Sequence, residues 1–332
     1  EQYFSDTEYI NYLSRDEILE KEISEMDGMF AIGEFLRISN DQIICNAFRD
    51  PVGEKHLWYY FGEDIFILSS VPSIIRKFLN NKSNLEINND AIDDYLKRRH
   101  LISPVEHPIK NISILNPGHK LLFRSNDWFL SETQFFKYEK LFSKELYIEL
   151  SKITQEEYNL KFNNIFGKTL ESMEYFSAKD NYSSCIISGG FDSSIVGGYL
   201  LNKQKNTNIY TMTFGAKDPV SKSVQNILTN KYNHDNILHK VIECNLDSYK
   251  KTLLRSINIL SSPVNTHSIP SSYIVAESSK NDGNLILYGG EGADEIFLGY
   301  ECYRNLNNDS SDYNKITDKF NFDKELNQRV SL

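Results

Sequence analysis

The sequence predicts an α/β domain with a parallel sheet in the second half of the chain, preceded by an α+β domain built on antiparallel strands. Two short apolar runs, residues 184–187 and 285–288, each end in a glycine-rich turn that leads into a helical pattern. Strand, tight turn and helix in this order are typical of parallel sheets. Between residues 30 and 69, short apolar segments instead alternate with turn residues, which predicts an antiparallel meander.

The first glycine-rich turn, residues 188–194, has the sequence Ser-Gly-Gly-Phe-Asp-Ser-Ser. Consecutive glycines allow positive φ and a close approach of ligand to backbone, and the helix that follows offers unpaired N–H groups to an anion. The turn has no lysine for a γ-phosphate. We therefore expect it to hold the β- and γ-phosphates of ATP as a departing pyrophosphate, with a turn that binds no ligand as the alternative.

A conventional P-loop is not present. The one partial match is Gly167-Lys168-Thr169, and the first glycine of that motif would fall on Phe162. Residues 158–173 have the pattern of an amphipathic helix instead. We expect this segment to be structural.

The second turn, residues 289–295, has the sequence Gly-Gly-Glu-Gly-Ala-Asp-Glu and places three carboxylates within five residues. Such carboxylates repel one another unless a cation or a cationic substrate lies among them. Ligands of open parallel sheets bind outside the carboxyl ends of the strands, so both turns are expected to face one crevice. Asp192 and Asp294 would then share a Mg²⁺ that bridges the phosphate oxygens. A solvated charged surface is the alternative, and the three glycines favour the cation site.

The two turns together, with Gly299-Tyr300 beyond them, resemble the asparagine synthetase family. The resemblance implies an α/β ATP-pyrophosphatase (PP-loop) domain over residues 141–332. It also implies a reaction in which a carboxylate attacks the α-phosphate of ATP, giving an acyl-adenylate and pyrophosphate, and an amine then forms the amide. By the same resemblance, Asp192 and Asp294 are Mg²⁺ ligands, and Glu291 acts in the adenylate and amine-attack steps.

The nucleotide site implied by this resemblance lies at the strand ends and in the two turns. Its expected members are Ile187, Ser188, Gly189, Gly190, Asp192, Ser193, Ser194, Phe214, Gly215, Gly289 and Gly290. The apolar pair Ile187 and Phe214 fits a buried core as well as it fits a nucleotide site.

Residues 1–140 resemble part of the Ntn-type glutamine amidotransferase domain of the glutamine-dependent members. The resemblance rests on Ser5-Asp6-Thr7-Glu8, on residues 27–32, on residues 49–60 and on residues 116–119, the last as a closing hairpin. It implies that Asp6 binds the α-amine of glutamine. The family's N-terminal cysteine is not found at the start of this sequence, which begins Glu-Gln-Tyr. We therefore expect the front of that domain to be missing, through truncation or cleavage.

Three functions remain open at this stage. The first is amide formation from a carboxylate, such as aspartate or a related acid, and ammonia from glutamine. The second is a ligase that uses an amine of the substrate itself, as in β-lactam synthetase or lasso-peptide cyclase. Glu291 favours the first, whereas Asn265-Thr266-His267, where an acid is common, favours the second. An inactive scaffold is the third.

Composition excludes several classes of protein. A net charge of −10 argues against nonspecific nucleic-acid binding. The sequence contains no run of about 18 apolar residues, the length that would predict a membrane-spanning helix. The four cysteines, at 45, 185, 244 and 302, have no C-x-x-C spacing, which favours reduced thiols and a cytoplasmic location. Family resemblance suggests a homodimer.

Overall fold

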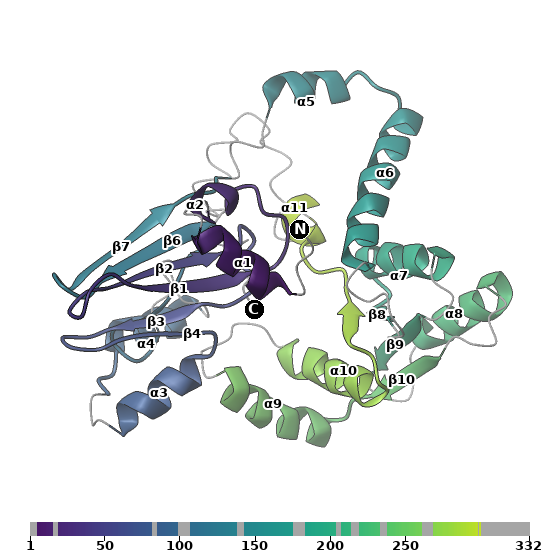
Figure 1. Cartoon of the computed structure of the whole chain (residues 1–332). Coiled ribbons are helices and arrows are strands. Elements are labelled where there is room, and N and C mark those ends of the chain that lie inside the picture. The colour runs from purple at the N-terminus through teal and green to yellow at the C-terminus, as the bar shows by residue number, and fades with distance from the viewer. Residues whose placement is uncertain are drawn as a thin grey trace. The chain divides into compact units, whose positions relative to one another are not determined.

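The computed structural model describes residues 5–15, 19–81, 85–98, 107–137, 143–174, 183–203, 207–213, 219–232, 238–260, 268–297 and 299. These residues group into two compact units, one mostly within residues 1–142 and one mostly within residues 143–308. Their helices and strands are labelled in Figure 1. The predicted domain boundary at residue 140 falls outside the described residues.

The first unit contains two antiparallel sheets, with strand orders β1-β2-β6-β7 and β4-β3-β5. The strands of the first sheet are β1 (Ala31–Arg37), β2 (Ile43–Arg49), β6 (His119–Arg124) and β7 (Phe129–Gln134). Those of the second are β3 (Trp58–Phe61), β4 (Phe66–Ser69) and β5 (Ile112–Ile114). The helices are α1 (Asp6–Arg15), α2 (Leu19–Glu22), α3 (Pro72–Asn80) and α4 (Asn89–Arg98).

The two sheets pack face to face, with a helical layer on each outer side. The cluster between the sheets includes Cys45, Ala47, Leu121, Phe123 and Tyr59. On the outer side of the first sheet, α1 and α2 pack through Leu13, Leu19 and Ile23 against Phe48. On the outer side of the second sheet, α3 packs through Ile75 and Leu79. Because successive strand side chains point to opposite faces, each strand serves both an inner and an outer layer.

Two expectations for this unit are wrong. The strands between residues 30 and 69 do not form one meander, because β2 pairs with β6 and β3 pairs with β4 and β5 in a separate sheet. Residues 116–119 do not close a hairpin either: they connect β5 in one sheet to β6 in the other. The hairpin is formed by β6 and β7. Alternating apolar residues report which face is buried, and they do not report which strands pair.

A buried arginine fixes the connection between the sheets. Arg49 is 1% exposed, and burial lowers its pKa to about 10 against the opposing effect of Asp50. The guanidinium donates hydrogen bonds to the carbonyl oxygens of Lys55, Leu115 and Gly53, at 2.8, 2.7 and 2.6 Å. The Asp50 carboxylate accepts hydrogen bonds from N–H groups of the same loop. Arg49 and Asp50, from the segment that resembles the amidotransferase domain, therefore hold the loop of residues 50–55 closed.

The second unit is built on one parallel sheet with strand order β10-β9-β8-β11, which confirms the predicted parallel sheet. Its strands are β8 (Ser183–Ile186), β9 (Asn208–Thr213), β10 (His239–Glu243) and β11 (Ile286–Tyr288). Its helices are α5 (Lys144–Leu150), α6 (Gln155–Glu174), α7 (Phe191–Lys203), α8 (Pro219–Ile227), α9 (Leu246–Leu260), α10 (Ile269–Asn281) and α11 (Ala293–Phe297), and a π-helical turn, η3 (Leu228–Tyr232), extends α8. Within the described part of the chain, no helix has the length and apolar character needed to cross a membrane.

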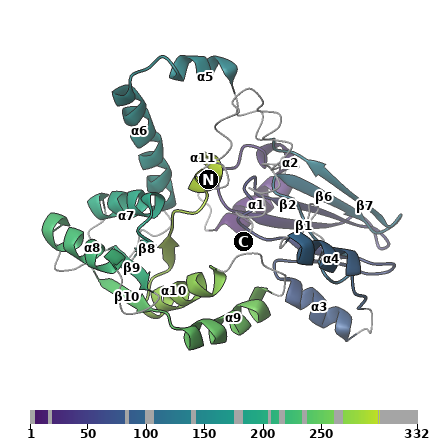
Figure 2. The ribbon, with the colours of Figure 1, turned by 180° about the vertical axis from the view of Figure 1, so that it is seen from behind.

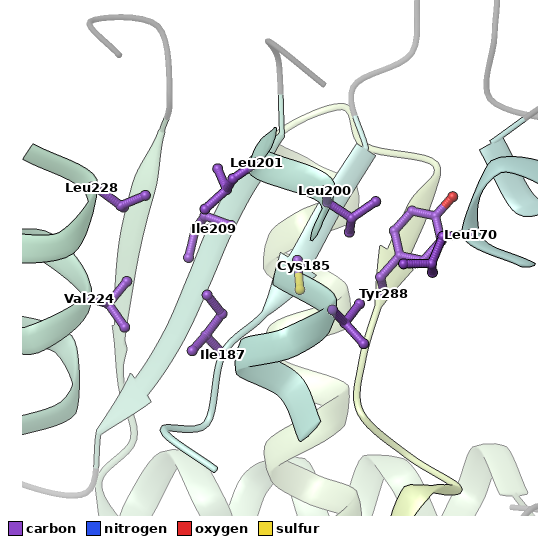
Figure 3. Packing of buried hydrophobic residues seen from close by; sticks show 10 residues of the cluster. Leu170, Cys185, Ile187, Leu200, Leu201, Ile209, Val224, Leu228 and Tyr288 are labelled. Carbon is purple, nitrogen blue, oxygen red and sulfur yellow. The ribbon is translucent and has the colours of Figure 1, made fainter. Parts of the chain in front are cut away.

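Helices cover both faces of this sheet, with α7 and α8 on one face and α10 on the other (Figures 1 and 2). Figure 3 shows the core of the first face, where Cys185 and Ile187 of the β8 segment meet Leu200 of α7 and Val224 of α8. Gly197 lets α7 approach closely, since a Cβ there would lie only 2.8 Å from Ile187 Cδ1. This close packing fixes where α7 begins.

The strand order places a switch point beside β8. This strand comes first in the chain among the four, yet β9 and β10 lie on one side of it and β11 lies on the other. The strand order therefore reverses between β8 and β11, and ligands of open parallel sheets bind outside the carboxyl ends of strands at such a point. The turn at residues 188–194 follows β8, and the turn at residues 289–295 follows β11.

A buried polar network sets the register of β11, which has only three residues. Asn284 is 4% exposed, accepts a hydrogen bond from Asn208 Nδ2 at 2.9 Å and donates one to the Tyr210 hydroxyl at 2.9 Å. The Ser184 hydroxyl on β8 donates to the carbonyl oxygen of Ile286 at 2.7 Å. A slip of one residue would turn every side chain of β11 to the opposite face. The network therefore determines where the second glycine turn starts.

We predict that Asn284→Ala destabilises the protein, because it removes the acceptor for the buried Asn208 amide. An unsatisfied buried donor costs about 1–3 kcal/mol, and we expect a loss of about 2 kcal/mol in the free energy of unfolding, measured by urea denaturation. The matched control is Asn164→Ala on the exposed surface of α6, which should change stability by less than about 0.5 kcal/mol. Equal stabilities of the two variants would show that the network does not hold β11.

Candidate functional site

The turn after β8 is short and ends in a helix. The Ile187 N–H donates to the Tyr210 carbonyl oxygen at 2.9 Å, so pairing with β9 continues for one residue beyond the strand. Gly189 then takes a positive φ of 86°, and α7 begins at Phe191. Asp192 and the two serines after it therefore lie in the first helical turn, earlier than the helix start expected from the sequence.

The serine hydroxyls hold this turn in shape. Ser193 Oγ accepts a hydrogen bond from the Ser188 N–H at 3.2 Å and lies 3.0 Å from Ser188 Oγ. Ser194 Oγ donates to the Gly190 carbonyl oxygen at 2.7 Å. The Ser194 N–H donates to the Gly190 carbonyl oxygen at 3.3 Å, whereas the earlier N–H groups of the first helical turn have no acceptor within the helix. The arrangement is a preformed helix start that favours an anion.

The glycines of both turns serve two different purposes. Gly189 and Gly292 adopt positive φ, 86° and 92°, as expected for glycine turns. Gly190, Gly289 and Gly290 do not adopt positive φ, so their backbone angles alone do not require glycine. At Gly189 a Cβ would also lie 2.8 Å from Val220 Cγ2 of α8, so α8 packs over this turn.

Gly290 brings the two turns into contact. A Cβ at this position would lie 2.6 Å from the Ser193 backbone nitrogen and 2.9 Å from the Asp192 carbonyl carbon. Real Cβ contacts are essentially never that short, and backbone atoms cannot move aside as a flexible side chain can. The turn after β11 thus lies directly against the start of α7, and only a residue without a side chain fits there.

The carboxylates of the second turn differ in their surroundings. The Glu291 side chain is exposed, and its carboxylate lies over Gly289, where a Cβ would overlap it. Burial, with a smaller contribution from the Glu291 charge, raises the pKa of the Cys185 thiol to about 12. The Asp294 carboxylate lies against Gly299, where a Cβ would again overlap it. Glu291 therefore lies close to the carboxyl end of β8.

The acidic side chains suit a hard cation that takes most of its ligands from elsewhere. Among the described residues, no group of three or more histidine, cysteine, aspartate or glutamate side chains is arranged to hold a metal ion. Mg²⁺ is usually bound through one or two carboxylates together with phosphate oxygens and water. Asp192 and Asp294, one from each turn, are the carboxylates that could bind a cation in that manner.

Other predicted residues lie elsewhere or outside the described part of the chain. Ile187 is 7% exposed, and its side chain belongs to the hydrophobic core. Asp6 is exposed at the start of α1, in the first unit. Phe214, Gly215, Tyr300, the Glu295 side chain and residues 265–267 lie outside the described residues.

Two contacts near the turns were not predicted. One is the packing of Val220 on Gly189, and the other is an edge-to-face contact of the Phe297 ring, on α11, with Phe162 on α6, with ring centroids 6.4 Å apart. Both pairs are distant in the sequence, and neither belongs to a motif. The regular spacing of Tyr158, Phe162 and Phe166 on α6 was the available signal for the second contact.

Comparison with known proteins assigns the second half of the chain to a family. Residues 171–331 match the family model of asparagine synthase, and this range contains both turns. Residues 171–331 belong to the asparagine synthase family. The resemblance seen in the motifs is thereby confirmed.

Three curated relatives of the asparagine synthase family match most of the chain. A putative asparagine synthetase (glutamine-hydrolyzing) 2 of Methanocaldococcus jannaschii is 26% identical over 292 residues, covering 85% of this chain and 52% of that protein. Asparagine synthetase (glutamine-hydrolyzing) 1 of Bacillus subtilis is 24% identical, covering 86% and 42%. The Rattus norvegicus asparagine synthetase (glutamine-hydrolyzing) is 25% identical, covering 89% and 50%. The chain thus spans about half the length of these relatives.

Two solved structures are more distantly similar. The NH3-dependent NAD synthetase of Campylobacter jejuni, in complex with nitrate, is 17% identical with a TM-score of 0.28, covering 42% of this chain and 60% of that one. The glutamine-dependent NAD+ synthetase of Acinetobacter baumannii, in complex with ADP, is 11% identical with a TM-score of 0.34, covering 90% and 67%. These TM-scores are too low for a comparison of sites.

We predict that Gly290→Ala separates the two turns. Relieving an overlap with backbone costs about 1–3 kcal/mol, so local opening becomes about five- to a hundred-and-fiftyfold more frequent. Hydrogen exchange should show faster exchange of backbone amides at residues 188–194 and 289–294, while amides of β9 keep the wild-type rate. Unchanged exchange in both turns would contradict the contact.

Proposed function

We propose that the chain uses ATP to activate a carboxylate and then forms an amide, in the manner of an asparagine synthetase-like ligase. The family match over residues 171–331 supports this class of reaction. The observation that carries the proposal for this chain is the packing of Gly290 on the first turn of α7. That packing supports the proposal because a helix start, which favours an anion, lies directly beside a turn with three carboxylates.

The first step uses the turn after β8 as a phosphate site. In the proposal, the backbone and hydroxyl groups of Ser188, Gly189, Gly190, Ser193 and Ser194 hold the β- and γ-phosphates of ATP. An oxygen of the substrate carboxylate attacks the α-phosphorus. The bond from the α-phosphorus to the bridging oxygen breaks, and pyrophosphate leaves with the electron pair. The first-turn N–H groups stabilise the charge of this leaving group.

Mg²⁺, held by Asp192 and Asp294, would supply further neutralisation of phosphate charge. In the proposal, Ile187, Gly289 and Gly290 line the ATP site. Phe214 and Gly215, which lie outside the described residues, stay predicted members of it. Ile187 contributes through its backbone, because its side chain lies in the core.

The second step needs a base. The nitrogen of the incoming amine attacks the acyl carbon, the bond to AMP breaks, and the nitrogen gives up a proton. We assign Glu291 as the acceptor of that proton. Its side chain is exposed and lies beside the end of β8, so it is open to a substrate.

Ammonia derived from glutamine is the proposed amine, with aspartate or a related acid as the carboxylate. The names of the relatives include glutamine hydrolysis, and Asp6 is the proposed ligand of the glutamine α-amine. The described cysteines, Cys45, Cys185 and Cys244, are all buried. Burial raises the pKa of Cys45 to about 12, which is unsuited to a nucleophilic thiolate. We therefore assign no glutamine-hydrolysing nucleophile to these three residues.

We predict that the protein, given ATP, Mg²⁺, L-aspartate and ammonium, releases AMP and pyrophosphate in equal amounts together with an amide. Asp192→Asn and Asp294→Asn should each lower the rate of pyrophosphate release by about a hundredfold or more, the usual loss when one group that stabilises transition-state charge is removed. The matched control is Asp247→Asn in the exposed first turn of α9, which should keep the wild-type rate.

The products separate the alternatives. Release of ADP and phosphate instead of AMP and pyrophosphate would contradict the proposal, and so would full activity of Asp294→Asn. Amide formation that needs no ammonium, in which an amine of the substrate itself attacks the activated carboxylate, would replace ammonia with an amine of the substrate.

A further inference from the structure

The short helix α11 carries Asp294 and has few means of holding its own shape. It contains five residues, Ala293–Phe297, and an isolated helix of this length is not stable in water. Two of its apolar side chains, Ile296 and Phe297, are 64% and 61% exposed. The direction of the Asp294 carboxylate must therefore depend on contacts that α11 makes with other parts of the unit.

Contacts within its own segment and a contact with α6 both act on α11. Within its own segment, the Ile296 N–H donates to the Gly292 carbonyl oxygen at 3.1 Å, and the Gly299 N–H donates to the Asp294 carbonyl oxygen at 2.9 Å. The ring of Phe297 makes the link to another element: it meets Phe162 of α6 edge to face, with centroids 6.4 Å apart and planes at 63°. This geometry is favourable for two aromatic rings.

Phe162 lies in a row of rings on α6, and the nearer of its two neighbours in that row leads to the core. It stacks with Tyr158 at 6.5 Å and with Phe166 at 5.7 Å, one helical turn before and after it. Phe166 in turn meets Tyr199 of α7 edge to face at 5.9 Å and packs against the core of the unit. The ring that receives Phe297 is therefore part of an aromatic row with one end in the core.

The same helix, α6, is also bound to α7. The Tyr199 hydroxyl donates to the Gly167 carbonyl oxygen at 3.1 Å, and Lys203 forms an ion pair with Glu171 at 3.0 Å. Asp192 lies in the first turn of α7. Thus α6 contacts both α7, which carries Asp192, and α11, which carries Asp294.

We infer that Phe162 is a positioning residue, which acts through Phe297 to hold α11 so that Asp294 faces the same phosphate-bound Mg²⁺ as Asp192. Phe162 belongs to neither glycine turn and takes no part in the chemistry. The inference rests on the proposed function for the role of Asp294, whereas the contact between the rings does not.

The test compares Phe162→Leu and Phe297→Leu with Tyr158→Leu, which removes a ring from the same row without touching α11. Phe162→Leu and Phe297→Leu should each raise the Mg²⁺ concentration for half-maximal pyrophosphate release by about two- to tenfold, the range expected for one lost aromatic pair, with little change of kcat at saturating Mg²⁺. The double variant should need no more Mg²⁺ for half-maximal pyrophosphate release than the more strongly affected single variant, because both substitutions remove the same contact. Tyr158→Leu should stay within about twofold of wild type.

A second readout does not depend on activity. Chymotrypsin should cleave after Phe297 faster in Phe162→Leu than in Tyr158→Leu, as measured by mass spectrometry of the fragments. Equal cleavage, or the same Mg²⁺ shift in all three single variants, would overturn the inference. If the wild-type protein releases no pyrophosphate, the proposed function has failed, and the cleavage rates still decide whether Phe162 holds α11.

Discussion

The contact between Gly290 and the first turn of α7 is the constraint on which the rest of the site depends. Backbone meets backbone there at distances that exclude even a methyl group. Without this contact, the helix start after β8 would be an ordinary anion-favouring terminus, and the acidic turn after β11 would be a cluster of mutually repelling charges. In contact, each turn supplies what the other lacks, since the helix start favours phosphate and the carboxylates favour the cation that accompanies phosphate.

The fold brings this contact about through strand order. Because β8 lies between β9 and β11, the two turns follow the carboxyl ends of neighbouring strands, at the point where the strand order reverses. The side chains at the opposite, amino end of the strands matter as well, because Asn284 and Ser184 set the register of the three-residue strand that precedes Gly289. A site of this kind depends on packing and hydrogen bonds at both ends of one short strand.

The parallel sheet and the location of both turns were predictable because their signals are local: an apolar run, glycines and a helical pattern within a dozen residues. Pairing between distant strands was not predictable, and the meander expected for residues 30–69 was wrong because β2 pairs with β6. Packing contacts such as Gly290 on Ser193 and Phe297 on Phe162 join segments that are far apart in the chain, so the residue pattern within one segment does not identify its partner. The roles of Asp192, Glu291 and Asp294 stay predictions, drawn from the family resemblance and the chemistry of their side chains.

In the proposed mechanism, the two turns bind a single Mg²⁺–nucleotide between them. A crystal structure with Mn²⁺ and an ATP analogue that has a methylene bridge between its α- and β-phosphates tests it most directly, because Mn²⁺ is located by its anomalous scattering. We predict one nucleotide, with its β- and γ-phosphates at the start of α7 and the metal bound by both Asp192 and Asp294. A nucleotide bound away from the start of α7, or a metal that contacts neither aspartate, would contradict the account.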